Sequence, residues 1–264
     1  MQFFTLYLYQ APLVLQIFPK GEKPHGLVFC LVAVAALLLV LAVHELGHLV
    51  AGLLQGFRFQ LFVVGPLGVT RSGDKIVVYF NRNLGYMGGV AATTPVTDDP
   101  QNQRKFALTV AAGPIASFLL AATGLLLFNL LPPGIGRGFW LLVTACSAGI
   151  CLATTLPTKT GMFFTDRARF FRLLDRGDTG KREAAMLSLM AIYTRDNSCR
   201  HIDPEKARLL QDDPEPSMRF WGLYYEYYFY KENLREDAAA ESRARLLDAK
   251  SAVPATLWKA LNIE

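Results

Sequence analysis

Three long runs of apolar residues dominate the hydrophobic pattern of the chain. They cover residues 27 to 54, 106 to 131 and 139 to 157. A helix needs about 20 mostly apolar residues to cross the hydrocarbon core of a bilayer, and each run is close to or above that length. The pattern therefore predicts an all-α polytopic membrane protein with three core transmembrane helices in a lipid bilayer.

A shorter apolar segment, residues 3 to 18, precedes the first run. It contains Pro12 and lacks the basic start and the small-residue cleavage site of a signal peptide. Two interpretations remain open for this segment, an interfacial helix or a fourth, tilted span. We expect residues 1 to 26 to form an N-terminal segment of one of these kinds.

Between the first two runs the pattern becomes typical of strands. Residues 57 to 64 (FRFQLFVV) and 75 to 80 (KIVVYF) are rich in aromatic and β-branched side chains, and GPLGVTRSGD between them resembles a turn. We expect a small β-hairpin beside the membrane. Residues 84 to 95 combine three glycines with a proline, which predicts irregular backbone that is buried in protein or lines a wet cavity.

Beyond residue 163 apolar residues recur at helical spacing while charged residues become dense, as around Met186, Met190 and Tyr193. We expect a membrane-embedded core over residues 27 to 172, followed by a soluble helical domain over residues 173 to 264. This C-terminal domain could bind a protein partner or mediate self-association.

Composition and charge support the membrane class. The 264 residues are 52% hydrophobic and only 19% charged, and the mean hydropathy is +0.25, which is too apolar for an ordinary soluble domain. The net charge of +5 does not indicate nucleic acid, because the basic residues flank apolar runs or alternate with acids. Lys and Arg are frequent in the loop after the first run and at the start of the tail, which predicts that both face the cytoplasm.

The sequence LAVHELGHLVAGLL ends the first run and places ionisable side chains where lipid is expected. His44 and His48 are four residues apart, so they share one face of a helix, and Glu45 lies on the adjacent side. Two imidazoles at this spacing can share one Zn²⁺ ion. The competing interpretation is a hydrogen-bonded polar seam. It is less favoured, because a charge at the centre of a span costs roughly 2.5 to 3.5 kcal/mol and is usually functional.

A catalytic zinc usually has three protein ligands, so a third side chain is required. No glutamate occurs between Glu45 and Glu183, and no later histidine occurs before the tail. The acidic candidates are Asp74, Asp98, Asp99 and Asp166. Pro157 and Gly161 would interrupt a helix before Asp166 and let the chain fold back toward the metal.

Three segments together resemble the site-2 protease family of intramembrane zinc metalloproteases. HELGH lies in the first run, AAGPIAS (111 to 117) resembles the family's Gly-Pro motif, and LPTKTGMFFTD (156 to 166) resembles its zinc-ligand motif. The resemblance covers roughly residues 27 to 172. The site residues that it implies are His44, His48 and Asp166 as ligands of one Zn²⁺, Glu45 as general base and acid, and Gly113, Pro114 and Ser117 as substrate-binding residues. Gly113 and Pro114 also fit a simpler role in close helix packing.

The chain departs from the family pattern at three places. Ser117 stands where asparagine is usual, Thr154 or Thr155 replaces an asparagine before Leu-Pro, and Arg167 replaces the glycine after the ligand aspartate. These changes favour an alternative class, a catalytically inactive protease-like scaffold or sensor that binds a partner. A zinc transporter would need further polar residues across the spans, and these are largely absent.

The favoured interpretation is a zinc metalloendopeptidase that cleaves a membrane protein or membrane-associated peptide in or near a transmembrane segment. Zinc would lower the pKa of its water from about 15.7 to roughly 7, and Glu45 would accept the proton. A helical substrate must unwind before its carbonyls can be attacked. An edge of the 57 to 80 hairpin could then hold the unwound stretch as an added strand.

Overall fold

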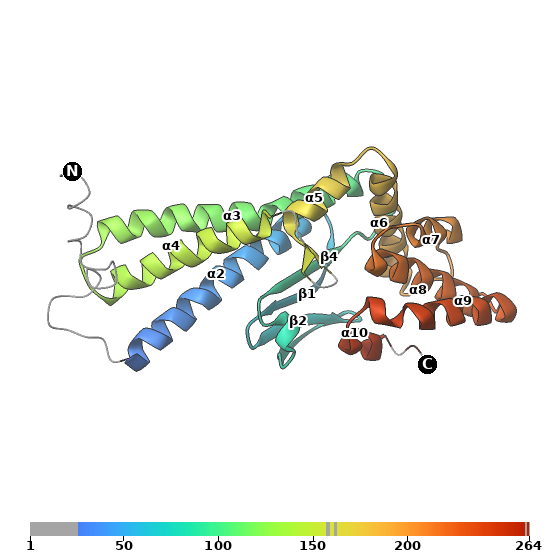
Figure 1. The fold of residues 1–264 in the computed structure, drawn as a ribbon, viewed down its shortest axis with the longest axis horizontal. Helices are drawn as coiled ribbons and strands as arrows, with labels where there is room; N and C mark the ends of the chain where they lie inside the picture. The colour runs from blue at the N-terminus through green and yellow to red at the C-terminus, as the bar shows by residue number, and fades with distance from the viewer. Residues whose placement is uncertain (1–25, 157–158, 161–162, 262, 264) are drawn as a thin grey trace, which may run out of the picture.

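The computed structural model describes residues 26–156, 159–160, 163–261 and 263. The apolar segment at residues 3 to 18 lies outside this range, so its two interpretations stay predictions. The described chain is mostly helical. Three long helices form one end of the molecule, a small sheet lies beside them, and shorter helices form the other end (Figure 1).

The three long helices match the three apolar runs. They are α2 (Gly26–Leu54), α3 (Asn102–Leu130) and α4 (Ile135–Thr154). Each is long and apolar enough to cross a membrane, which agrees with the three predicted spans. Much of their outer surface consists of exposed leucine and phenylalanine side chains, such as Leu31 and Phe118. A lipid bilayer would cover this surface.

Helices α2 and α3 approach closely at Gly47. A Cβ atom at Gly47 would lie 2.7 Å from the carbonyl oxygen of Ala112 and 2.8 Å from the Cβ atom of Ala116. Only a residue without a side chain allows this distance, as in other membrane helix pairs built on small residues. Because Gly47 lies between Glu45 and His48, the close approach brings this turn of α2 against α3.

The sheet has four antiparallel strands in the order β3-β2-β1-β4. Their bounds are β1 (Arg58–Val64), β2 (Leu67–Ser72), β3 (Lys75–Phe80) and β4 (Val90–Thr94). The predicted hairpin is wrong in its pairing, because β2 lies between the two expected strands. Gly65 and Gly73 both have positive φ and close two separate tight turns, so the glycine-rich stretch holds two turns around a strand instead of one long turn.

The segment expected to be irregular, residues 84 to 95, is only partly so. It contains a short 3₁₀ helix, η1 (Leu84–Tyr86), and then β4, which pairs with β1. The backbone is irregular up to Gly89 and becomes a strand directly after it. The prediction missed β4 because glycines and small residues carry little of the alternating pattern that marks a strand.

A short helix, α5 (Asp166–Leu174), follows the two small strands β5 (Lys159–Thr160) and β6 (Phe163–Phe164). Leu173 of α5 and Leu187 pack together against Ala107 and Val110 of α3. The Gln103 side chain donates hydrogen bonds to the carbonyls of Leu173 and Gly180, at 2.7 and 3.2 Å. Helix α5 therefore continues across the domain boundary expected at residues 172 and 173.

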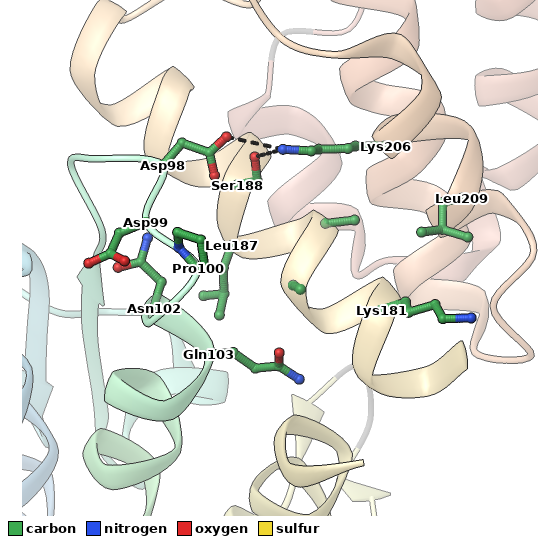
Figure 2. Close-up of a pocket in the computed structure, with 12 residues that line it drawn as sticks. Asp98, Asp99, Pro100, Asn102, Gln103, Lys181, Leu187, Ser188, Lys206 and Leu209 are labelled. Atoms are coloured by element: carbon green, nitrogen blue, oxygen red, sulfur yellow. Dashed lines mark hydrogen bonds and ion pairs between the residues drawn. The ribbon is translucent and has the colours of Figure 1, made fainter. Parts of the chain in front are cut away.

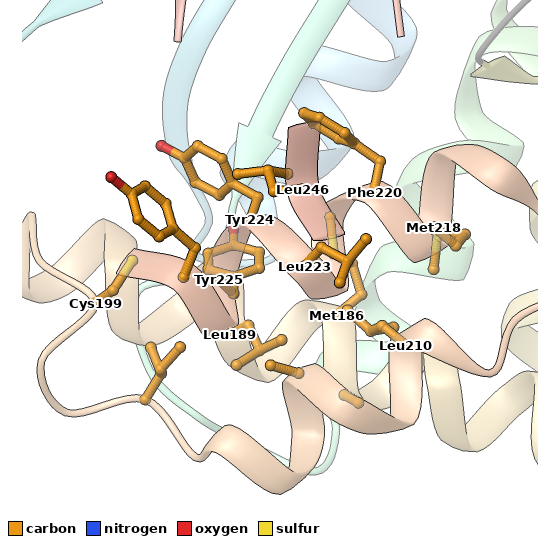
Figure 3. Close-up of a cluster of buried hydrophobic side chains, with 14 of the residues drawn as sticks. Met186, Leu189, Cys199, Leu210, Met218, Phe220, Leu223, Tyr224, Tyr225 and Leu246 are labelled. Atoms are coloured by element: carbon orange, nitrogen blue, oxygen red, sulfur yellow. The ribbon is translucent and has the colours of Figure 1, made fainter. Parts of the chain in front are cut away.

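The remaining helices, called the C-terminal helices below, surround a second apolar core (Figure 3). They are α6 (Asp178–Asp196), α7 (Pro204–Gln211), α8 (Pro216–Glu232), α9 (Glu236–Asp248), η2 (Ala249–Ala252) and α10 (Ala255–Ala260). Leu189, Leu210, Phe220 and Leu246 are fully buried in this core. Tyr224 and Tyr225 pack there as well, so the aromatic run of α8 serves helix packing.

Polar contacts join the C-terminal helices to the rest of the chain. The Lys206 ammonium lies 3.0 Å from Asp98 Oδ2 and 2.6 Å from Ser188 Oγ, beside a cleft of about 400 Å³ between α6, α7 and the start of α3 (Figure 2). Arg58 of β1 donates to the carbonyl of Thr194 at 2.8 Å. The C-terminal helices thus contact both the sheet and α3.

A valine at Gly47 should push α2 away from α3, because its side chain would overlap the Ala112 carbonyl. Overpacking of this kind costs about 1 to 3 kcal/mol, so the thermal unfolding midpoint of purified Gly47→Val in detergent should fall. Gly149→Val is the matched control in α4, where a Cβ atom meets nothing within 4 Å. An equal drop for both variants would contradict the close contact.

Candidate metal centre

His44, Glu45 and His48 lie on the second half of α2, and His44 and Glu45 are buried. The two imidazole rings meet edge to face with centroids 4.9 Å apart, and their Nε2 atoms are 3.3 Å apart. The four-residue spacing on a continuous helix produces this arrangement. Both Nε2 atoms therefore face one point beside α2.

Asp166 faces the same point from α5, of which it is the first residue. Its Oδ2 atom lies 3.3 Å from His44 Nε2, and its Oδ1 atom lies 3.4 Å from His48 Nε2. The candidate ligand atoms of the three residues all lie within 4.8 Å of one another. Three side chains from two distant segments therefore form a compact group that could hold a metal ion.

The other acidic candidates lie elsewhere. Asp74 is exposed between β2 and β3, Asp98 pairs with Lys206, and Asp99 pairs with Lys105 at 2.7 Å. Among the candidates that the sequence left open, the structure thus brings only Asp166 to the histidines within its described residues.

The donor set of this group fits a divalent cation. The Oδ2 atom of Asp166 is buried and lies 3.3 Å from His44 Nε2 without a well-aligned hydrogen bond to a described residue, and a metal ion would satisfy it. Burial alone would raise the pKa of the Asp166 carboxyl, but the two imidazoles beside it hold that pKa at about 2. The carboxyl is therefore ionised at neutral pH, as a metal ligand must be. Two imidazoles and one carboxylate are a combination that suits zinc.

Helix α3 supports both imidazoles from behind. His48 Nδ1 lies 2.9 Å from the carbonyl oxygen of Thr109, which can only accept, so Nδ1 is the donor there and Nε2 is the nitrogen that faces Asp166 and could bind a metal ion. His44 Nδ1 lies 2.9 Å from the Ser117 hydroxyl. Such outer partners fix the orientation of a ligating histidine.

Ser117 is fully buried, and its backbone carbonyl accepts a hydrogen bond of 2.8 Å from Ser147 of α4. The structure thus places it behind His44, whereas the resemblance assigned it to substrate binding. From this position its hydroxyl can orient the imidazole but faces no open surface.

Gly113 and Pro114 lie in the middle of α3. A Cβ atom at Gly113 would lie 2.2 Å from His48 Nε2, so the absent side chain makes room for the imidazole. Pro114 follows it and is half-buried. Gly113 therefore allows close packing of α3 against His48, a candidate ligand.

Sequence reasoning did not assign a role to Gly89 or Thr109. Gly89 has a φ of +101°, and a Cβ atom there would lie 2.7 Å from Glu45 Oε1. The three glycines of residues 84 to 95 were the available signal, since they predicted a close approach of this backbone. Thr109 contributes through its backbone carbonyl, which every residue type has, so the sequence gives no signal for this contact.

The two remaining departures from the family pattern contact each other. Arg167 donates to the carbonyl of Thr155 at 3.3 Å, and its guanidinium lies over the ring of Phe171 at 5.6 Å. The hydroxyls of Thr154 and Thr155 bond to the carbonyl of Cys151 within α4. Arg167 thus turns away from the three-residue group, although it directly follows Asp166.

These features describe a chain with three helices that are apolar enough to cross a membrane and with a candidate metal centre formed by two of its histidines and an aspartate. The model of peptidase family M50 matches residues 32–253, which is most of the chain. The chain therefore belongs to peptidase family M50, the site-2 protease family of membrane metallopeptidases. The match continues through α9 and so reaches well beyond the three motifs. No curated protein and no solved structure gives a significant match.

Removing the Ser117 hydroxyl should weaken metal binding. Ser117→Ala leaves His44 Nδ1 without its partner, and loss of such outer partners typically lowers metal affinity by about 10- to 100-fold. Competition with a chromophoric chelator measures the affinity for zinc. Thr123→Ala is the control on α3, because among the described residues that hydroxyl bonds only to the Leu119 carbonyl of its own helix. Unchanged affinity in Ser117→Ala would contradict the supporting role.

Proposed function

We propose that the chain is a zinc metalloendopeptidase that hydrolyses a peptide bond in or near a transmembrane segment of a membrane protein or membrane-associated peptide. The observation that carries the proposal is the convergence of His44, His48 and Asp166, with Glu45 buried next to His44. Membership of family M50 supports it. The charge pattern supports an active site and a C-terminal region on the cytoplasmic side.

One Zn²⁺ ion held by His44, His48 and Asp166 would acidify a water molecule and polarise the scissile carbonyl. Glu45 would accept the proton of the water and return it to the leaving amine. Its carboxylate lies against Gly89, directly before β4, and Glu45 as a residue is only 9% exposed. This burial limits the positions of the carboxylate and favours transfer over a short distance.

The structure changes the expected docking edge for an unwound substrate. The outer edge of β1, which the predicted hairpin would have exposed, is covered by β4. Among the described strands β4 pairs only with β1, and it starts directly after Gly89. We therefore propose that substrate adds as a strand to β4, because this edge passes closest to Glu45.

The inactive-scaffold alternative drew its support from Ser117 and Arg167. Ser117 contacts a candidate ligand from behind, and Arg167 points to Thr155. Neither side chain displaces one of the three candidate ligands. Both departures are therefore compatible with a working metal centre, and the protease remains the better-supported function.

Glu45→Gln tests the function directly. The variant should keep one zinc ion per chain, because the three ligands are unchanged, but it should cleave about 10²- to 10⁴-fold more slowly, since it lacks a general base. Zinc content and cleavage of model single-span substrates give the two readings. Asp166→Ala should lose the metal. Stoichiometric zinc in the wild-type chain without any turnover would favour the scaffold instead.

Gly89→Ala should slow cleavage while leaving metal content unchanged. The new Cβ atom would press on the Glu45 carboxylate, and a positive φ strains alanine. Gly88→Ala is the neighbouring control, because a Cβ atom there meets nothing within 4 Å. Equal rates for the two variants would exclude a role of the Gly89 contact in placing Glu45.

A further inference from the structure

Two buried carboxylates of the C-terminal region face two arginines of α5. The side chains of Glu183 in α6 and Asp213 before α8 are both 0% exposed. Glu183 Oε2 lies 2.8 Å from Arg169 Nη2, and Glu183 Oε1 accepts from Arg172 Nε at 2.6 Å. Arg172 Nη2 donates to Asp213 Oδ2 at 2.6 Å. Two positive and two negative groups therefore close one buried cluster.

Further contacts hold the members of this cluster in place. The second oxygen of Asp213 accepts from the backbone amide of Glu215 at 2.9 Å. The guanidinium of Arg172 lies 4.6 Å from the ring centre of Phe164, and that of Arg169 lies 5.9 Å from the ring centre of Phe106 on α3. A planar guanidinium with several fixed partners orients the helix that carries it.

The same helix carries the third candidate ligand. Asp166 begins α5, and Arg169 and Arg172 follow three and six residues later. A helix of nine residues has little stability of its own, so its contacts determine where it lies. For α5 these contacts include Leu173 against α3, Arg167 against the carbonyl of Thr155, and the two arginines against the C-terminal region.

Burying charged side chains between two helices carries a large desolvation free energy, so such pairs add little to stability alone. Apolar residues of similar size often serve equally well, whereas removing one partner of a buried ion pair leaves the other uncompensated. Directional pairs of this kind suit an interface whose exact orientation matters. Here that orientation sets the direction in which α5 presents Asp166.

We propose that Glu183 and Asp213 are positioning residues of the metal centre, through which the C-terminal helices hold α5 with Asp166 beside His44 and His48. The inference rests on the proposed function, since it takes these three residues as metal ligands. Coupling between two sites is reciprocal. Metal binding therefore also strengthens the attachment of α6 to the membrane core.

The test compares zinc affinity among full-length variants purified in detergent, with a chromophoric chelator as competitor. Glu183→Gln and Asp213→Asn keep the size of the side chain and remove its charge. Both should bind zinc about 10- to 100-fold more weakly than the wild type.

Glu226→Gln is the matched control. Glu226 is also buried and lies 3.1 Å from Arg208 and 3.3 Å from Arg245, but these partners belong to the C-terminal helices themselves. This variant should bind zinc within about twofold of the wild type, on the same reasoning about outer partners. If Glu226→Gln weakens binding as much as Glu183→Gln does, the effect is a general loss of fold and the positioning role is overturned.

A second measurement needs no variant of the cluster and applies even if Glu183→Gln does not fold. Amide hydrogen exchange across residues 178 to 196 of the wild-type chain should be slower with zinc than with a chelator. The difference should vanish in Asp166→Ala.

Failure of the positioning role and failure of the proposed function give different results. The positioning role is overturned if Glu183→Gln and Asp213→Asn bind zinc as tightly as the wild type, or if zinc does not change amide exchange in α6. In either case the proposed function still stands, provided that zinc binding is lost in Asp166→Ala. Zinc binding that is absent from the wild type, or that survives in Asp166→Ala, would overturn both.

Discussion

The meeting of the Asp166 carboxylate with two imidazoles on an apolar helix is the contact on which the rest of the structure depends. Ionisable groups on a membrane-spanning helix are costly unless each polar atom has a partner. The Nδ1 atoms find theirs on α3, at Thr109 and Ser117, and the Nε2 atoms face Asp166. Metal binding would complete the set, because the buried Asp166 Oδ2 atom makes no well-aligned hydrogen bond to a described residue.

This requirement explains features of the fold that are otherwise unconnected. Helix α3 must pass close behind α2 to supply a hydroxyl and a carbonyl, and Gly47 and Gly113 remove the side chains that would prevent it. The sheet must approach from another side without a side chain at Gly89, so that Glu45 keeps its place. Helix α5 must cross the end of α3 to deliver Asp166. Each approach depends on a small residue or a short helix in the right position.

The sequence was sufficient for the features that are encoded locally. The three spans follow from apolar length, and the pair of histidines follows from a four-residue spacing. The strand β2 was missed because Gly65 and Gly73, which close separate turns, look like one loop. The Ser117 contact and the cluster of Arg172 with Glu183 join residues distant along the chain. No periodicity or motif signals such pairs, since only the packed fold brings them together.

The residues that depart from the family pattern and the C-terminal helices both contact the segments that carry the candidate ligands, and so both help to hold these ligands in place. A serine in place of asparagine is short enough to bond His44 from within the helix bundle, and Arg167 occupies the carbonyl of Thr155 at the end of α4. The ligand atoms stay together while the residues behind them differ. If the third ligand is held by a helix that is itself held through Glu183 and Asp213, any event that shifts α6 alters metal affinity without contact with substrate. Control of proteolysis would then require only a movement of the C-terminal helices.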